Sequence, residues 1–188
     1  MARVFCIVRS SNGLDPHQDF NALISFYMDN PPATVVAQET RMFKHILVPT
    51  DGSQLSMDTA QRAISFAREA GARITFFFAK PDYPVAFYGE GALIDPTTPE
   101  KFAEMAERQA REILGRCTTK AEEAGVSCAS VSTVNDIPYE AIIDAAQNAG
   151  CDLIFMASHG RRGLSGLLLG SETQKVLTHS RIPVLIYR

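Results

Sequence analysis

This chain of 188 residues lacks several patterns that assign a protein to a class at sight. Its four cysteines form neither a CxxC pair nor a Cys/His spacing, so we expect buried small side chains in a reducing compartment, not a zinc or redox site. No apolar run approaches the roughly 20 residues that span a bilayer. A formal net charge of -3 argues against a broadly basic surface, so neither nucleic acid nor a membrane is an expected partner.

Two common nucleotide-binding motifs are missing as well. The chain has no GxxxxGK[ST] sequence, and therefore no phosphate-binding loop with its lysine. No GxGxxG follows the first regular strand, which counts against a dinucleotide site. A nucleotide would have to be held by another arrangement of backbone amides.

An evident catalytic constellation is also missing. The sequence offers no paired carboxylates with acid/base spacing and no activated nucleophile, and its histidines fit no metal-ligand spacing. His159 has no Asp or Cys beside it in the sequence and is interpreted as a structural or phosphate-facing residue, not a general base. No catalytic residue and no metal ligand is therefore predicted.

What is present divides near Met42. With 46% hydrophobic and 21% charged residues, the composition is that of a globular domain. Residues 1–41 have no clear period and contain a Pro-Pro pair, so we expect a loosely structured N-terminal extension ahead of a domain at 42–188. Two explanations stay open for this extension: translation that really starts at Met42, which we favour, and a genuine N-terminal arm.

From Met42 onward, strand and helix patterns alternate. A short apolar run at 45–49 is typical of a strand buried on both faces, and a helix with apolar residues at helical spacing follows it up to Gly71. Five such strands and four helices predict an α/β fold with an open five-stranded parallel sheet and helices on both faces. Further strands are expected at 73–79, 126–134, 151–157 and 183–187, and a long loop at 80–98.

A glycine-rich loop after the fourth strand predicts an anion site. Gly160 allows close backbone approach, and Gly170 leads into a helix whose first amides are free to bind phosphate. Ligands of parallel sheets bind beyond the carboxyl ends of the strands, where the loops at 49–53 and 157–171 can converge. The alternative is that the glycines only shape a loop and Ser171 only caps a helix.

This spacing resembles the universal stress protein family over residues 42–188. Nucleotide-binding members show G-x2-G-x9-G-[ST], matched here by Gly160, the nine-residue interval, Gly170 and Ser171, whereas Ala157 replaces the first glycine. The segments 46–53 (ILVPTDGS) and 180–186 (SRIPVLI) match as well. The resemblance implies the strand order 3-2-1-4-5 of the adenine nucleotide alpha hydrolase-like fold.

The resemblance also implies a site for ATP or AMP, with any Mg bound through the phosphates. Asp51 would bind the ribose, the Ala79 backbone the adenine edge, and the start of the last helix the outer phosphates. An alanine at 157 would be strained at positive φ but harmless at an extended strand end. We expect the extended conformation, because Ala157 directly continues the apolar strand. The predicted nucleotide-binding residues are Pro49, Thr50, Asp51, Ala79, Met156, Ala157, His159, Gly160, Arg161, Gly163, Gly170, Ser171, Glu172 and Thr173.

The expected function is that of a cytoplasmic stress-response regulator that binds ATP or AMP without robust catalysis. The resemblance further implies a homodimer through the C-terminal strand, Val184–Tyr187. The alternatives are a nucleotide-free homodimeric interaction module, and a weak ATPase or autokinase that modifies Ser171 or Thr173. Electron transfer with FMN fits the fold class by analogy alone.

Overall fold

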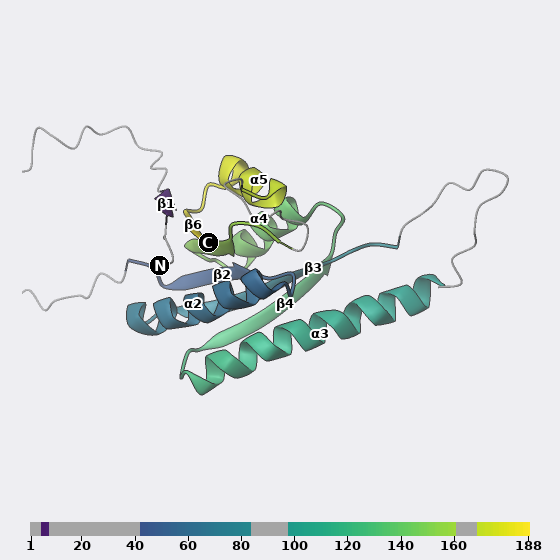
Figure 1. Cartoon of the computed structure of the whole chain (residues 1–188), viewed down its shortest axis with the longest axis horizontal. Coiled ribbons are helices and arrows are strands. Elements are labelled where there is room, and N and C mark those ends of the chain that lie inside the picture. Colours follow the sequence, from purple (N-terminus) through teal and green to yellow (C-terminus); the bar gives the residue numbers. More distant parts are fainter. Residues whose placement is uncertain (1–4, 8–41, 84–97, 161–168) are drawn as a thin grey trace, which may run out of the picture.

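The computed structural model describes residues 5–7, 42–83, 98–160 and 169–188. Within them, a six-stranded sheet runs in the order β1-β6-β5-β2-β3-β4 (Figure 1). Strands β2 to β6 are all parallel, and counted from β2 their order is the predicted 3-2-1-4-5. The strands are β1 (Phe5–Ile7), β2 (His45–Pro49), β3 (Arg73–Lys80), β4 (Cys128–Val134), β5 (Leu153–Ala157) and β6 (Val184–Tyr187).

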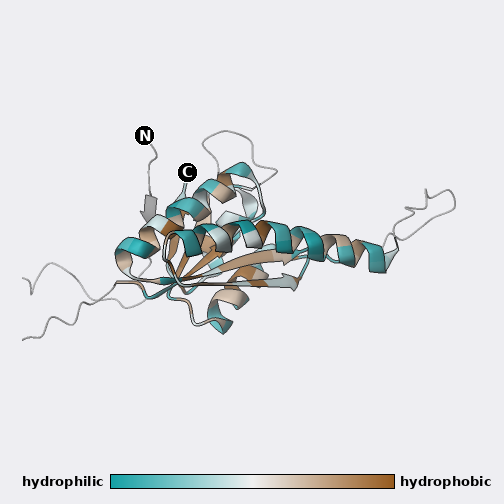
Figure 2. Cartoon of the chain, turned by 90° about the horizontal axis from the view of Figure 1, so that it is seen from below, coloured by the Kyte–Doolittle hydropathy of each residue, from teal (hydrophilic) through white to brown (hydrophobic). Residues whose placement is uncertain are grey.

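Helices cover both faces of this sheet, as the alternating pattern predicts. On one face α2 (Gln54–Ala70) and α3 (Pro99–Glu123) pack on Ile46, Phe76 and the other side chains of that face. On the opposite face α4 (Pro138–Asn148) and α5 (Ser171–His179) pack on Leu47 and Phe77. The apolar strands therefore lie between helices whose outer faces are hydrophilic (Figure 2).

Local signals in the sequence set the ends of the helices. Ser53 caps α2 by accepting a hydrogen bond from the amide of Ser56, and Gly71 ends that helix at φ 63°, a conformation that glycine adopts without penalty. Thr98 caps α3, and Pro99 occupies its first turn. Helix α4 differs, because its N-cap residue Ile137 contributes no side-chain hydrogen bond. Another group must satisfy its first amides.

The amino end of the sheet is closed by a polar cluster. The carboxylate of Asp152 accepts hydrogen bonds from the amides of Lys44 and His45. His45 is buried, and its Nε2 lies 2.8 Å from the hydroxyl of Thr75. Burial, and then the charge of Arg73, lowers the pKa of His45 from 6.5, against the opposing effect of Asp152. The folded state therefore favours the neutral imidazole.

The N-terminal region contributes one strand to the sheet. β1 pairs antiparallel with β6, with Phe5 opposite Ile186 and Ile7 opposite Val184. The outer edge of β6, where the family resemblance predicts a homodimer contact, is thus occupied by the chain's own β1. Among the described residues, no helix is long and apolar enough to cross a membrane.

Candidate functional site

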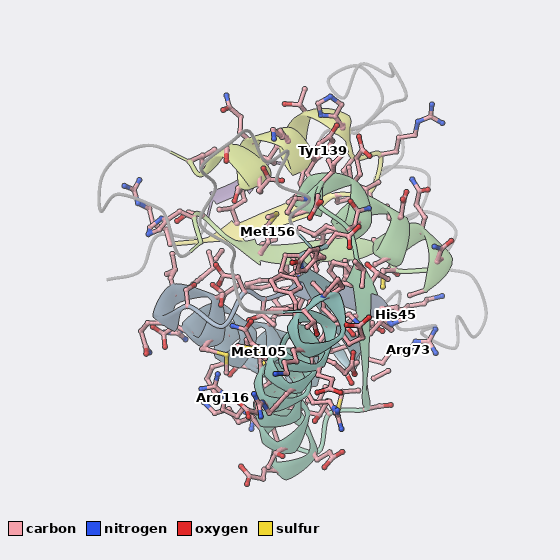
Figure 3. The ribbon with its side chains drawn as sticks, turned by 90° about the vertical axis from the view of Figure 1, so that its right-hand side faces the viewer. His45, Arg73, Met105, Arg116, Tyr139 and Met156 are labelled. Carbon is pink, nitrogen blue, oxygen red and sulfur yellow. The ribbon has the colours of Figure 1, made fainter. Side chains whose placement is uncertain are left out.

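A cavity of about 630 Å³ opens at the carboxyl ends of the parallel strands. Such a volume is within the usual range for sites that enclose a small molecule. β2, β3 and β5 and the first turns of α4 and α5 form its walls, and part of this wall is apolar, including Phe77, Ile142 and Met156. Figure 3 shows Met156 on β5. The cavity lies where a sheet of this topology is expected to bind ligands.

All predicted site residues that the structure describes line this cavity. They come from the β2–α2 loop, the end of β3, the end of β5 and the start of α5. They are Pro49, Thr50, Asp51, Ala79, Met156, Ala157, His159, Gly160, Gly170, Ser171, Glu172 and Thr173. Arg161 and Gly163, predicted with them, and most of the loop 80–98 lie outside the described residues.

Asp51 and Gly160 lie against each other. One carboxylate oxygen of Asp51 accepts a hydrogen bond of 2.9 Å from the amide of Ser53, which fixes the side chain in the loop after β2. The other oxygen, Oδ2, would lie only 2.5 Å from a Cβ placed on Gly160. A side chain at position 160 would therefore displace the Asp51 carboxylate.

Thr50 makes the loop after β2 rigid. It is buried, its amide donates to the carbonyl of Phe77, and its hydroxyl lies 3.0 Å from that of Ser56. Gly52 turns the chain at φ 77°. Because of these contacts, Asp51 is presented on a fixed backbone at the cavity.

Gly170 joins the two ends of the glycine-rich loop. Its amide donates a 2.8 Å hydrogen bond to the carbonyl of Ser158, and a Cβ at this position would come within 3.1 Å of the Cα of His159. Glycine fits at position 170 because the backbone of His159 leaves little room for a side chain there. The amide of Gly170 is therefore engaged within the protein, and the free amides at this end belong to the first turn of α5, which begins at Ser171.

Thr173 is one of the residues that the family resemblance assigns to the outer phosphates. The structure shows that this side chain is buried and that its hydroxyl donates to the carbonyl of Ala157 at 3.0 Å. Its proton is thus used in holding α5 to the end of β5. The hydroxyl of Ser171, on an exposed residue, has no such restraint from burial.

Ala157 adopts the extended conformation. It is the last residue of β5 and pairs in register with Tyr187 of β6. Any residue adopts such a backbone, so alanine in place of the family's glycine introduces no strain here. His159, two residues on, has its Nδ1 3.1 Å from the hydroxyl of Ser158.

Glu172 connects the two helices of this wall. Its Oε2 accepts a 2.9 Å hydrogen bond from the amide of Tyr139 in the first turn of α4, and its Oε1 accepts one of 3.0 Å from the ammonium of Lys175. The ring of Tyr139 lies beside α5, 5.2 Å from that of His179 (Figure 3). The carboxylate thus supplies the cap that Ile137 does not provide.

Several residues that line the cavity were not predicted from the sequence. Asp136 and Pro138 follow the carboxyl end of β4, so the rule that located the loops after β2 and β5 points to them as well. Asp136 also joins two loops, because it accepts a 2.9 Å hydrogen bond from the amide of Asp82. Gln109 lies in the middle of α3, where no sequence signal marks it. The remaining lining residues are Ser56, Phe77, Phe78, Pro81 and Ile142.

The described part of the chain contains no evident metal-binding site. Among the described residues, no group of three or more His, Cys, Asp or Glu side chains is arranged to hold a metal ion. What the cavity offers is one carboxylate beside a glycine, a set of helix amides and an apolar wall. This combination suits a ligand with a flat apolar part, hydroxyl groups and an anionic end.

Comparison with known proteins agrees with this geometry. The profile of the "Universal stress protein family" matches residues 42–188. Universal stress protein MJ0531 of Methanocaldococcus jannaschii is 28% identical over 88% of this chain and 92% of its own length. Universal stress protein Sll1388 of Synechocystis sp. is 31% identical over 75% and 95%. A solved universal stress protein in complex with cAMP is 25% identical, with a TM-score of 0.56 over 77% of this chain and 96% of that one.

Proposed function

Because this chain belongs to the universal stress protein family, we propose that its cavity binds an adenine nucleotide, AMP or ATP. The single observation that carries the proposal is the contact between Asp51 and Gly160, because it brings the carboxylate that we expect to bind the sugar next to the glycine-rich loop. The similar protein solved with cAMP supports the adenine nucleotide as ligand. In this proposal the protein is a regulator in the cytoplasmic stress response, without robust catalysis.

Each part of the nucleotide has a complementary part of the cavity. The base lies against the apolar wall near Met156 and is bound by the Ala79 backbone. The ribose hydroxyls donate to Asp51, whose position the amide of Ser53 fixes. The phosphates approach Gly160 and the first turn of α5, where free amides and the helix dipole favour an anion. Any Mg²⁺ is held through the phosphates.

Released nucleotide and thermal stabilisation test this function. We expect denatured protein to release adenine nucleotide, or the melting temperature to rise with added AMP or ATP. A ligand at 100 times its Kd stabilises the folded state by about 2.7 kcal/mol. Asp51→Asn should weaken this response, because it removes the carboxylate charge and keeps an oxygen for the Ser53 amide.

The matched control is Asp58→Asn on α2, whose exposed side chain accepts a hydrogen bond from Gln54 and is not among the residues that line the cavity. It should respond like the unmodified protein. No released nucleotide together with no stabilisation at millimolar AMP or ATP with magnesium would leave the nucleotide-free interaction module as the better description. Repeated turnover of ATP to ADP would instead favour an ATPase. An autokinase would have to modify Ser171, because Thr173 is buried.

A homodimer through β6 is the second part of the proposal, and the pairing of β1 with β6 supports it. That pairing demonstrates that the edge accepts an antiparallel strand. Since β1 occupies the edge, we propose that a second copy binds β6 only after β1 leaves.

Sedimentation velocity of the double variant Cys6→Pro/Ile7→Pro tests this competition. One of any two neighbouring strand residues directs its N–H toward β6, and proline has no N–H. We expect the variant to form more dimer than the unmodified chain. A variant that remains monomeric at every concentration tested would rule out this dimer.

A further inference from the structure

Glu172 lies at the end of the cavity where the phosphates are proposed to bind. It is the second residue of α5 and lines the cavity next to Ser171 and Thr173. Its two carboxylate oxygens are held by the Tyr139 amide and the Lys175 ammonium, at 2.9 and 3.0 Å. The carboxylate therefore has a fixed position between the first turns of two helices.

Those two first turns are also the natural binding places for an anion. A helix N-terminus presents free amides and a partial positive charge. At α4 this place is taken by Glu172, since the helix receives no side-chain hydrogen bond from its own N-cap residue. A phosphate that approached the Tyr139 amide would have to displace the carboxylate.

Fewer groups remain for the outer phosphates than the family motif implies. The amide of Gly170 donates to Ser158, and the hydroxyl of Thr173 donates to Ala157. The charged side chains among the described lining residues are three carboxylates, with no lysine or arginine; they are Asp51, Asp136 and Glu172. Within the described part of the cavity wall, a chain of several phosphates would therefore face carboxylates and no lysine or arginine side chain.

We infer that Glu172 restricts this site to nucleotides with a single phosphate, so that AMP binds more tightly than ATP. The inference rests on the proposed nucleotide site. In this inference a single phosphate binds the amides near Gly160 and Ser171. The second and third phosphates add negative charge beside a fixed carboxylate, and a divalent cation offsets part of that repulsion. Glu172 acts as a specificity residue.

Calorimetric titration with AMP and with ATP, in EDTA at constant ionic strength, tests this inference. We expect AMP to bind at least about tenfold more tightly than ATP, which corresponds to ~1.4 kcal/mol. In Glu172→Gln this ratio should fall toward one through tighter ATP binding. The amide oxygen of glutamine can still accept from Tyr139, so the cap of α4 is retained. Magnesium should narrow the ratio in the unmodified protein.

Two further variants separate charge from folding. Glu140→Gln makes the same substitution in the first turn of α4, on a side chain that accepts from the Tyr139 hydroxyl and does not line the cavity, so the ratio should be unchanged. Lys175→Met removes the partner of Glu172 from an exposed position, and the ratio should widen.

The outcomes distinguish the two proposals. If ATP binds the unmodified protein as tightly as AMP in EDTA, or if Glu172→Gln leaves the ratio unchanged, the role of Glu172 is refuted and the nucleotide site stands. If neither nucleotide binds the unmodified protein, the nucleotide site itself is refuted. Should Glu172→Gln fail to fold, the response of Lys175→Met decides, and an unchanged ratio there refutes the inference.

Discussion

Replacing Gly160 with alanine is the sharpest test of how this cavity is built. The new Cβ would lie 2.5 Å from Oδ2 of Asp51, whereas ordinary contact begins at 3.4 Å, so the carboxylate must move by about 0.9 Å (3.4 − 2.5). Gly160 lies outside the left-handed region, so alanine adds no backbone strain. The whole effect should therefore pass through Asp51.

The size of this effect follows from what Asp51 holds. Moving its carboxylate weakens the 2.9 Å hydrogen bond from Ser53, a loss of about 1 kcal/mol at a half-buried site. In a domain of this size that lowers the melting temperature by roughly 2–4 °C. AMP binding should fall more, by about 10- to 100-fold, or ~1.4–2.8 kcal/mol, because the carboxylate proposed to bind the ribose is displaced.

A double-mutant cycle identifies the cause. In an Asp51→Ala background, Gly160→Ala should have little further effect on stability or binding, because the clash has no second partner. Gly115→Ala is the matched control: it lies in α3 with nothing within 4 Å of its Cβ, so it should be neutral or stabilise the helix by up to ~1 kcal/mol. Equal losses with and without the Asp51 carboxylate would refute this reasoning.

Two further predictions concern stability. The pKa of His45 is lowered in the folded state, so below pH 6.5 this side chain binds a proton more readily in the unfolded chain than in the folded one. The contribution of His45 to stability should therefore be fully present above pH 6.5 and decline below it, by at most about 1.4 kcal/mol per pH unit. Urea unfolding at pH 7.5 and pH 5 measures the loss of stability between these two pH values. The loss should be smaller in His45→Gln than in the unmodified protein, and an equal loss in both would show that other groups cause it. Thr173→Val removes a buried hydroxyl bonded to Ala157 and should cost about 1–2 kcal/mol, whereas Thr178→Val, at an exposed position of the same helix, should cost under ~0.5 kcal/mol. Similar losses in chemical denaturation would show that burial of the Thr173 hydroxyl contributes nothing.

Much of the fold could be predicted from the sequence because the patterns that specify its helices and strands are local. The apolar run at 45–49, the cap at Ser53 and the stop at Gly71 each act within one segment, and their alternation implies parallel strands covered on both faces. The order of the strands came from the family resemblance, and the structure confirms it. Position at a strand's carboxyl end was enough to bring Asp51 and Gly160 into one cavity, since all parallel strands end at the same edge of the sheet.

From Met42 onward, the sequence by itself determined which elements form and which loops meet, because hydrophobic period, caps and turns are properties of neighbouring residues. The pairing of β1 with β6 was not among its predictions. Only the tertiary structure decided which polar groups remain free for a ligand. Three polar groups at this end of the cavity are each bonded to a group from another part of the fold: the hydroxyl of Thr173, the amide of Gly170 and the carboxylate of Glu172. Gln109 shows the converse, since packing alone carries it from the middle of a helix to the cavity wall. A hydrogen bond depends on which atoms meet across the chain, and that meeting exists only once the sheet and its helices have assembled.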